Sequence, residues 1–285
     1  MVGSPFSPAY ATKRRRGEAA RAIDHAAMNV AIYGPGARRW ALTERGIAGG
    51  DRTASALTLG ASAMWWEGGA LRVRLDERSA VLGRPIRGAL TLRPTTPPAG
   101  SFALDGAALH HWWPIAPSAA IEVELDEPRL RFRGHGYHDA NAGDVALEAS
   151  FARWCWARGP RAGGGAFLTY DTVELGGRRG AIALAVDGHG AVMPLASLAD
   201  RRLRPTLWAL GRRARSDEDG GARVVRTLED TPFYARSLVA ARLAGEEVVA
   251  MHEAISLSRL RSRLVQTLIP YRMRRADAPG VKWAR

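Results

Sequence analysis

The 285-residue sequence is poor in cysteine, lysine and long hydrophobic runs. Its single cysteine, Cys155, excludes an internal disulfide and a cysteine-rich zinc module. The longest mostly apolar stretch, 56–66, falls well short of the roughly 20 residues that a membrane-spanning helix needs. The N-terminal part carries a basic run at 13–16 and lacks the apolar core of a secretory signal. These features predict a cytoplasmic protein without a transmembrane helix.

The basic residues are almost all arginine, and they are spread over the whole chain. The sequence has 41 basic and 28 acidic residues, a net charge of +13. In runs such as 71–75 arginine alternates with apolar residues, whereas nucleic-acid-binding proteins usually gather positive charge into a stripe. We therefore expect no nucleic-acid partner. The excess charge would still attract a membrane rich in acidic lipids, which predicts peripheral membrane association.

Hydrophobic residues recur with a period of two, which is typical of half-buried strands in antiparallel sheets. Turn residues separate the runs, and those at 67–69 and 244–246 predict hairpins. Helical signals are confined to 14–27 and 257–268. The sequence therefore predicts an all-β barrel or sandwich with few short helices. The predicted strands are 29–33, 38–44, 71–75, 86–92, 121–125, 130–136, 151–158, 167–172, 181–185, 224–228, 235–243 and 248–257.

One proline-rich segment interrupts this pattern. Residues 92–106 include three prolines, and proline cannot donate a hydrogen bond to a strand ladder. We interpret the segment as a linker and place a domain boundary near residue 106. The predicted domains are 1–105 and 106–285.

Histidine and tryptophan are concentrated in one part of the chain, where four of the seven histidines and four of the nine tryptophans fall within 49 residues. Residues two apart on a strand share a face, so Tyr137 and Asp139 can point into one cavity while His138 points away. His110 can share a face with Trp112 in the same way. An apolar lining would raise the pKa of a buried Asp, and aromatic faces would stabilise a nearby cation. The pattern predicts an acid held in an aromatic chamber.

Three motifs carry this cluster: His-His-Trp-Trp-Pro at 110–114, Gly-His-Gly-Tyr-His-Asp-Ala-Asn-Ala-Gly at 134–143 and Trp-Cys-Trp-Ala-Arg at 154–158. They resemble the motifs of the carotenoid 1,2-hydratases, also called hydroxyneurosporene synthases. Their order and spacing extend the resemblance over nearly the whole chain. Further matching blocks lie at 6–8, 29–34, 39–46, 228–236, 252–253 and 270–273.

The resemblance implies a tandem lipocalin-like fold, two antiparallel β-barrels side by side. It also implies a hydro-lyase that adds water, without a cofactor, to the terminal 1,2 double bond of an acyclic carotene such as neurosporene or lycopene. The family's catalytic residues correspond to His110, Trp112, Tyr137 and Asp139. Members of the family carry a further strand-forming segment ahead of the block at 6–8. We therefore expect an incomplete first barrel, because translation starts upstream or because the chain is shortened.

Hydrating an isolated alkene requires a strong, well-placed proton donor, because the barrier lies in forming the carbocation. We interpret Asp139 as the acid that protonates C2. Trp112 and Trp113 would stabilise the tertiary cation at C1, and His110 or Tyr137 would orient the attacking water and take its proton. The residues predicted to contact the substrate are Trp113, His138, Asn141, Trp154 and Trp156.

Structural roles fit the same residues and stay open at this point. The motif at 110–114 fits an aromatic core corner, Asp139 an Asx turn, and Tyr137 a buried ring with a satisfied hydroxyl. Trp154 and Trp156 fit a barrel core. Cys155 is expected to be an inert buried thiol.

Metal and cofactor sites are not predicted. His135 and His138 lie on opposite faces of a strand, and no dinucleotide fingerprint is present. His252 and Glu253 diverge for the same reason as the two histidines, so we expect no cooperating acid–base pair there.

Two other functions fit the same scaffold. One is a lipocalin-like protein that holds a carotenoid or another lipid without chemistry. The other is an isomerase or cyclase, since a fold does not fix a reaction.

Overall fold

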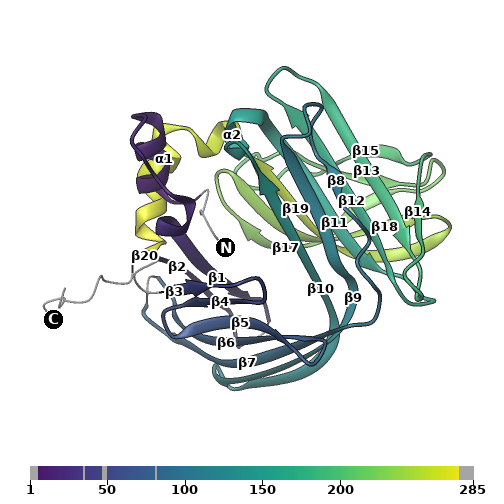
Figure 1. Cartoon of the computed structure of the whole chain (residues 1–285). Coiled ribbons are helices and arrows are strands. Elements are labelled where there is room, and N and C mark those ends of the chain that lie inside the picture. The colour runs from purple at the N-terminus through teal and green to yellow at the C-terminus, as the bar shows by residue number, and fades with distance from the viewer. Residues whose placement is uncertain (1–5, 35, 47–49, 81, 276–285) are drawn as a thin grey trace, which may run out of the picture. The chain divides into compact units, whose positions relative to one another are not determined.

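The computed structural model describes residues 6–34, 36–46, 50–80 and 82–275. Most of these residues lie in strands and the helices are short, which confirms the predicted β-rich class. The chain forms two compact units, which Figure 1 allows the reader to follow by colour. Unit 1 comprises Met1–Arg93, Ile121–Gly134 and Gln266–Arg285, and unit 2 comprises Pro94–Ala120 and His135–Val265. The division into barrels at residue 106 stays a prediction.

Unit 1 contains two groups of strands. Antiparallel β1 (Ala26–Ile32) and β2 (Arg39–Arg45) form one group, and β20 (Arg274–Arg275) pairs in parallel with β2. The other group runs in the order β3-β4-β5-β6-β7, and the distal half of β9 and the first part of β10 belong to the same unit. The remaining elements are α1 (Pro8–Arg15), the 3-10 helices η1 (Ala22–His25) and η3 (Ile269–Tyr271), β3 (Gly50–Arg52), β4 (Ala56–Leu59), β5 (Ser62–Glu67), β6 (Ala70–Arg78) and β7 (Pro85–Pro94).

A buried carboxylate organises unit 1. Glu77 on β6 accepts hydrogen bonds from the hydroxyls of Thr43 and Ser62, both over 2.6 Å. Arg45 pairs with it at 2.7 Å. Buried charges persist only when they are paired and hydrogen-bonded in this way, so Glu77 ties β2 and β5 to β6.

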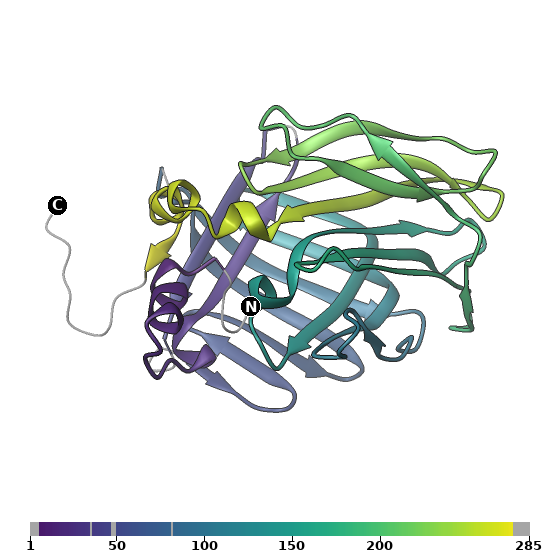
Figure 2. The same ribbon diagram turned by 90° about the horizontal axis from the view of Figure 1, so that it is seen from above.

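Unit 2 is built on a seven-stranded antiparallel sheet in the order β14-β13-β12-β11-β19-β18-β17. The proximal half of β9 (His110–Glu127), the last part of β10 (Leu130–Gly143), and β8 (Phe102–Ala103), which pairs with β9, belong to the same unit. Its other elements are α2 (Leu147–Ser150), β11 (Phe151–Pro160), β12 (Ala166–Glu174), β13 (Arg179–Val186), β14 (Val192–Pro194), β15 (Ala199–Leu203), β16 (Arg212–Ser216), β17 (Ala222–Asp230), β18 (Tyr234–Leu243), β19 (Glu246–Ser256) and α3 (Leu257–Leu260). Figure 2 shows the helical segments α3 and α4 (Arg263–Leu268) following the end of β19.

The two faces of the seven-stranded sheet have different neighbours. On β11 and β12, Trp154 and Tyr170 project from one face and make ring contacts with each other. Cys155 projects from the other face and packs against Leu210, Ala235 and Ala254. The short hairpin of β15 and β16 lies on this second face, where Leu203 and Ala214 pack against Val239 of β18. Alternation along each strand therefore separates an aromatic face from a face covered by the hairpin.

The predicted strands all overlap observed ones, and both predicted hairpins are confirmed. Gly68 and Gly69 have φ of 56° and 71°, which matches a tight two-residue turn between β5 and β6. The predicted strand ranges did not include the proximal half of β9 or the strands β3, β4, β5, β8, β14 to β16 and β20. Many of these strands are too short to show a clear alternation.

The helix predicted at 14–27 was wrong, because α1 occupies Pro8–Arg15 instead. Ser7 caps it by accepting a hydrogen bond from the backbone N–H of Tyr10 over 3.1 Å, and Pro8 suits the first turn. Gly17, with φ of 68°, follows its end. The helix predicted at 257–268 is confirmed in position but is split into α3 and α4. Of the helices in the described ranges, none is long and apolar enough to cross a membrane.

Candidate active site

Three of the four predicted catalytic residues meet in unit 2. Tyr137 and Asp139 lie on β10, and Trp112 lies on the neighbouring strand β9. The indole N–H of Trp112 donates to Asp139 Oδ2 over 2.8 Å, and the Tyr137 hydroxyl donates to the same oxygen over 3.0 Å. The structure thus joins an indole, a phenol and a carboxyl group through one oxygen atom.

Burial raises the pKa of Asp139, and the two donors lower it by a smaller amount. The charge of Glu253 raises that pKa further. Since both donors occupy Oδ2, the proton of the neutral acid belongs on Oδ1. When Oδ1 releases that proton, the same two hydrogen bonds stabilise the carboxylate that remains. The raised pKa and the two hydrogen bonds to one oxygen distinguish Asp139 from an exposed carboxylate.

An aromatic wall surrounds this acid. The buried ring of Trp112 packs edge-on against Tyr170 at 5.3 Å, and Tyr170 contacts Trp154 at 6.1 Å. The ring of Tyr137 lies 5.2 Å from that of Trp156. Trp154 and Trp156, which fitted either a core or a substrate contact, thus lie next to the residues that bind Asp139. Such π-systems attract positive charge to their faces.

His110 shares a face with Trp112 but makes other contacts. Its Nδ1 lies 2.9 Å from Asp105 Oδ2, and its Nε2 lies 3.1 Å from the carbonyl oxygen of Val145. Asp105 also accepts from the backbone N–H groups of Leu109 and His110, and its hydrogen bonds with His110 lower the pKa of its carboxyl against the effect of burial. Because both ring nitrogens face acceptors, these contacts do not favour His110 as the group that takes a proton from water.

The remaining predicted contacts do not join the cluster. Trp113 alternates to the other face of β9, where its ring stacks on His111 at 5.8 Å. His138 lies between Tyr137 and Asp139 on β10, so strand alternation assigns it to the opposite face, and burial lowers its pKa. Asn141 is exposed. A role for these three residues in substrate binding stays a prediction.

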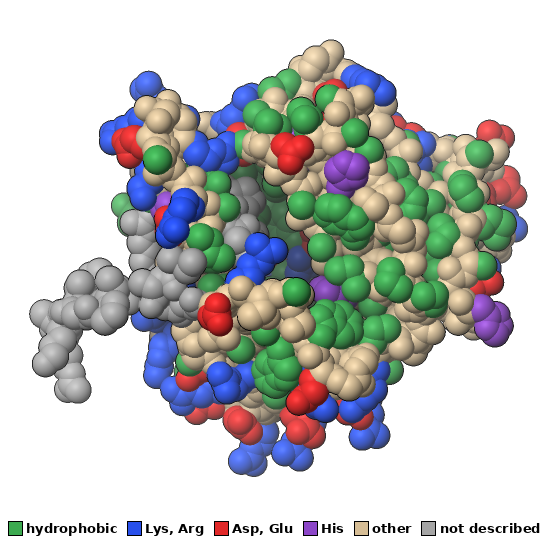
Figure 3. All heavy atoms as spheres, in the orientation of Figure 1, with side chains coloured by type: hydrophobic (Ala, Val, Ile, Leu, Met, Phe, Trp, Pro, Cys, Tyr) green, Lys and Arg blue, Asp and Glu red, His purple; other side chains and the backbone are tan. Residues whose placement is uncertain are grey.

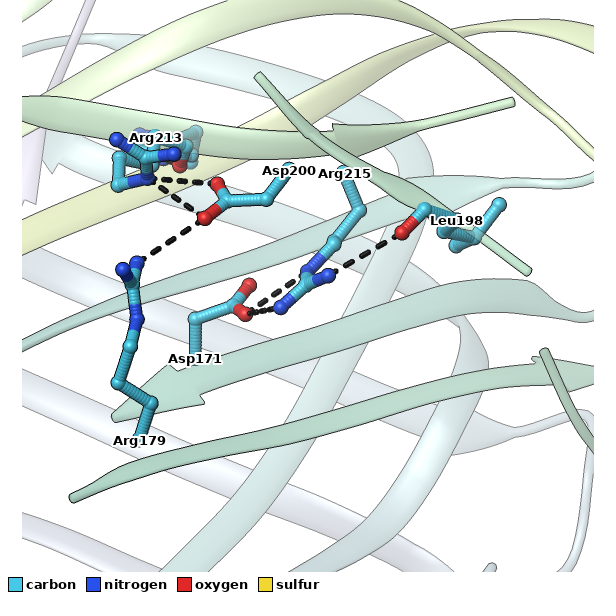
Figure 4. A network of polar contacts seen from close by, with 7 residues as sticks. Asp171, Arg179, Leu198, Asp200, Arg213 and Arg215 are labelled. Carbon is cyan, nitrogen blue, oxygen red and sulfur yellow. Dashed lines mark hydrogen bonds and ion pairs between the residues drawn. The ribbon is translucent and has the colours of Figure 1, made fainter. Parts of the chain in front are cut away.

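Two cavities in unit 2 differ in character. One of about 160 Å³ is lined in part by Asp105 and Tyr170 and so adjoins the aromatic cluster. Another of about 410 Å³ opens on the opposite face of the sheet, where charged side chains line it. There Arg215 pairs with Asp171, and Arg213 pairs with Asp200 at 2.7 Å (Figure 4). Such a charged lining suits a hydrocarbon poorly.

The second cavity also contains Cys155, which was expected to be inert. Burial raises the pKa of this thiol to about 11, so it is not a thiolate at neutral pH.

Within the described part of the chain, no group of three or more His, Cys, Asp or Glu side chains could hold a metal ion.

Four residues of the site were not predicted from the sequence as its members. Asp105 and Gly143 fix His110, and a Cβ added to Gly143 would lie 2.3 Å from the His110 ring. Tyr170 completes the wall beside Trp112. The sequence pattern relates Glu253 only to His252, whereas in the structure its charge acts on Asp139. The alternation of β12 placed Tyr170 on one of two faces, but no local signal identified which face meets the acid.

The chain resembles known proteins over nearly its whole length. The family model described as carotenoid hydratase CrtC matches residues 1–282. An acyclic carotenoid 1,2-hydratase of Thiocapsa roseopersicina is 42% identical over 276 residues, which cover 96% of this chain and 68% of that protein. The enzyme of the same name from Rubrivivax gelatinosus is 37% identical with the same coverage. That of Cereibacter sphaeroides is 36% identical and is covered over 96% of both chains.

Proposed function

Because this chain belongs to the carotenoid hydratase family, we propose that it adds water to the terminal C1=C2 double bond of an acyclic carotene such as neurosporene or lycopene. The product is a 1-hydroxy-1,2-dihydro carotenoid, a tertiary alcohol. The observation that carries the proposal is the carboxyl group of Asp139, which two hydrogen bonds hold among aromatic rings and whose pKa burial raises.

In the first step Asp139 donates the proton on Oδ1 to C2 of the alkene. The electron pair of the double bond forms the C2–H bond and leaves a tertiary cation at C1. Trp112 and Tyr137 stabilise the Asp139 carboxylate through the hydrogen bonds that they already donate. These two hydrogen bonds become stronger as negative charge develops on Asp139, and neither donor has to move.

In the second step the cation is sheltered until water attacks C1. The rings of Trp112, Trp156 and Tyr170 present π-electron density, which stabilises positive charge without offering a nucleophile. The reaction adds H and OH across one bond and transfers no electrons between molecules, so substrate and water balance it without a redox cofactor.

We also propose that the units are the lipocalin-like barrels of a tandem fold.

We further propose that the protein collects its substrate at a membrane surface, since a forty-carbon hydrocarbon resides in the bilayer. The loop between β15 and β16 displays Leu207 and Trp208, which are 99% and 53% exposed. Arg259 fixes this loop by donating to the carbonyl oxygens of Trp208 and Ala209 over 2.8 and 3.0 Å. Rigid, exposed Leu and Trp next to arginine suit the interface of a membrane with acidic lipids. On the face seen in Figure 3, basic side chains are interspersed with acidic and hydrophobic ones.

The test is conversion of lycopene or neurosporene in detergent micelles, followed by mass analysis of the tertiary alcohol. We expect the full chain to form the alcohol and Asp139→Asn to lose on the order of 10²-fold or more of that activity while remaining folded. Asp126→Asn removes an exposed carboxylate and serves as the matched control. Carotene that is bound and recovered unchanged by the full chain would contradict hydration and support a binding protein.

A further inference from the structure

One cross-strand row of unit 2 contains a second carboxylate. Trp156 on β11 pairs with Tyr170 on β12 and with Glu253 on β19, and Glu253 pairs in turn with Arg236 on β18. Residues directly opposite each other on antiparallel strands project from the same face, with Cβ atoms about 5 Å apart. Tyr170, Trp156, Glu253 and Arg236 therefore stand side by side on one face of the sheet.

That face is the one turned toward Asp139. Trp156 contacts the ring of Tyr137, Tyr170 contacts the ring of Trp112, and both contacted residues donate to Asp139. Glu253 is the next member of the row after Trp156. Its negative charge raises the pKa of Asp139 and of Tyr170, as expected for a carboxylate on the same face of the sheet.

The two carboxyl groups have opposite surroundings. Asp139 accepts from two neutral donors, whereas Glu253 forms an ion pair with the Arg236 guanidinium. An arginine partner stabilises the charged form of a carboxylate. Two carboxyl groups whose environments differ in this way are suited to act as acid and base in one reaction.

The second step of the proposed hydration requires a proton acceptor. Water that attacks C1 must lose a proton, and the ring nitrogens of His110 already face Asp105 and a carbonyl oxygen. The Tyr137 hydroxyl donates to Asp139, and burial raises its pKa, so it remains protonated. Of the charged groups in the row, Glu253 is the carboxylate, and a carboxylate can accept a proton on either of its two oxygens. Arg236 donates to one of them, Oε1.

We propose that Glu253 is the catalytic base of the hydration, which orients the attacking water and takes its proton, and that Arg236 positions it. This inference rests on the proposed function. A water lone pair forms the C1–O bond, and the proton lost by that oxygen passes to the Glu253 carboxylate. Asp139 is then ionised and Glu253 neutral. Glu253 releases its proton to solvent and Asp139 takes one up, which restores both groups.

The test separates proton transfer to carbon from the attack of water, by running the reaction in D₂O. In Glu253→Gln, Asp139 still protonates C2, but the cation returns to alkene by losing a proton. We expect this variant to lose on the order of 10²-fold or more of alcohol formation while deuterium enters the recovered carotene. Asp139→Asn is expected to show neither product nor exchange.

Arg236→Gln supplies the matched control, because it breaks the same ion pair but keeps the base. We expect it to lose less than about tenfold of alcohol formation, well below the loss in Glu253→Gln. Equal losses in the two variants would identify a purely structural ion pair and overturn the inference. Normal turnover in Glu253→Gln, or loss of both exchange and hydration there, would overturn it as well. If the unaltered chain forms no alcohol, the proposed function itself fails, and the inference fails with it.

Discussion

Trp112 and Asp139 lie on neighbouring strands, and the indole N–H of Trp112 donates to the carboxyl oxygen Oδ2 of Asp139 over 2.8 Å. The ring of Trp112 also packs against Tyr170. One side chain thus does two things, since its N–H lowers the pKa of Asp139 while its ring packs against the aromatic ring of Tyr170. The two roles can be separated by a substitution that keeps a ring and removes the N–H.

Trp112→Phe is expected to weaken Asp139 as an acid. A hydrogen bond to a charged group contributes about 1.5–3 kcal/mol, which corresponds to roughly one or two pKa units. Loss of the donor raises the pKa of Asp139 further. The neutral form is the active one, present below the pKa and lost above it, so the alkaline limb of the pH profile should move to higher pH while the maximal rate falls. Hydration rates measured across pH check this, with Trp40→Phe on β2 of unit 1 as the control, and an unshifted profile in Trp112→Phe would contradict the prediction.

Gly143→Ala is expected to displace His110. The added Cβ would lie 2.3 Å from His110 Cδ2, closer than any real packing contact. We expect the free energy of unfolding to fall by about 1–3 kcal/mol, together with a loss of hydration activity. Urea denaturation measures the change. In Gly163→Ala the new Cβ meets nothing within 4 Å, so an equal loss in that variant would rule out the contact with His110 as the cause.

His252 is expected to make the fold acid-sensitive. It is buried, its Nε2–H donates to the Arg213 carbonyl oxygen over 2.8 Å, and burial lowers its pKa to about 4. Between pH 6.5 and 4 the unfolded chain binds a proton that the folded chain does not. The free energy of unfolding should therefore fall by roughly 3 kcal/mol as the pH drops through this window. Above pH 6.5 the stabilising contribution of neutral His252 is complete.

His252→Gln tests this assignment, because glutamine does not titrate. The stability difference between the unaltered chain and this variant should narrow as the pH falls from 7 to 5 in urea denaturation. A difference that stays constant would show that other groups cause the acid sensitivity.

The loop at Leu207 and Trp208 is expected to bind membranes. Replacing both side chains by serine removes their apolar surface from the contact and should lower the affinity for vesicles containing acidic lipids by tenfold or more. Vesicle sedimentation measures the binding. Leu82→Ser removes a leucine that is 67% exposed elsewhere on the chain, and its affinity should be unchanged. Equal weakening by this control would show that the loop is not the docking site.

Local periodicity was sufficient to predict much of the strand content and one important pair. The alternation along β10 placed Tyr137 and Asp139 on one face, and the two side chains are hydrogen-bonded to each other. The same rule held for His252 and Glu253, whose side chains contact Arg213 and Arg236 respectively. Alternation depends only on neighbouring residues, so it can be deduced from a short stretch of sequence.

Contacts between distant strands could not be deduced in this way. Tyr170 and Glu253 reach the site through the pairing of β12 and β19 with β11, and strand register depends on the whole sheet. The contact of Asp105 with His110 arises from the turn before β9, which no periodic pattern describes. The pattern of apolar residues at 257–268 also did not predict that the helix there is split into α3 and α4.

The discontinuous make-up of the two units limits how the gene can be divided. The polypeptide changes unit after Arg93, Ala120, Gly134 and Val265, so each unit takes its residues from separate stretches of sequence. No single cut yields two complete pieces, and a fragment ending anywhere between these points would lack strands of both. The protein should therefore be engineered as an uninterrupted polypeptide, with split-reporter or modular-fusion strategies restricted to its ends.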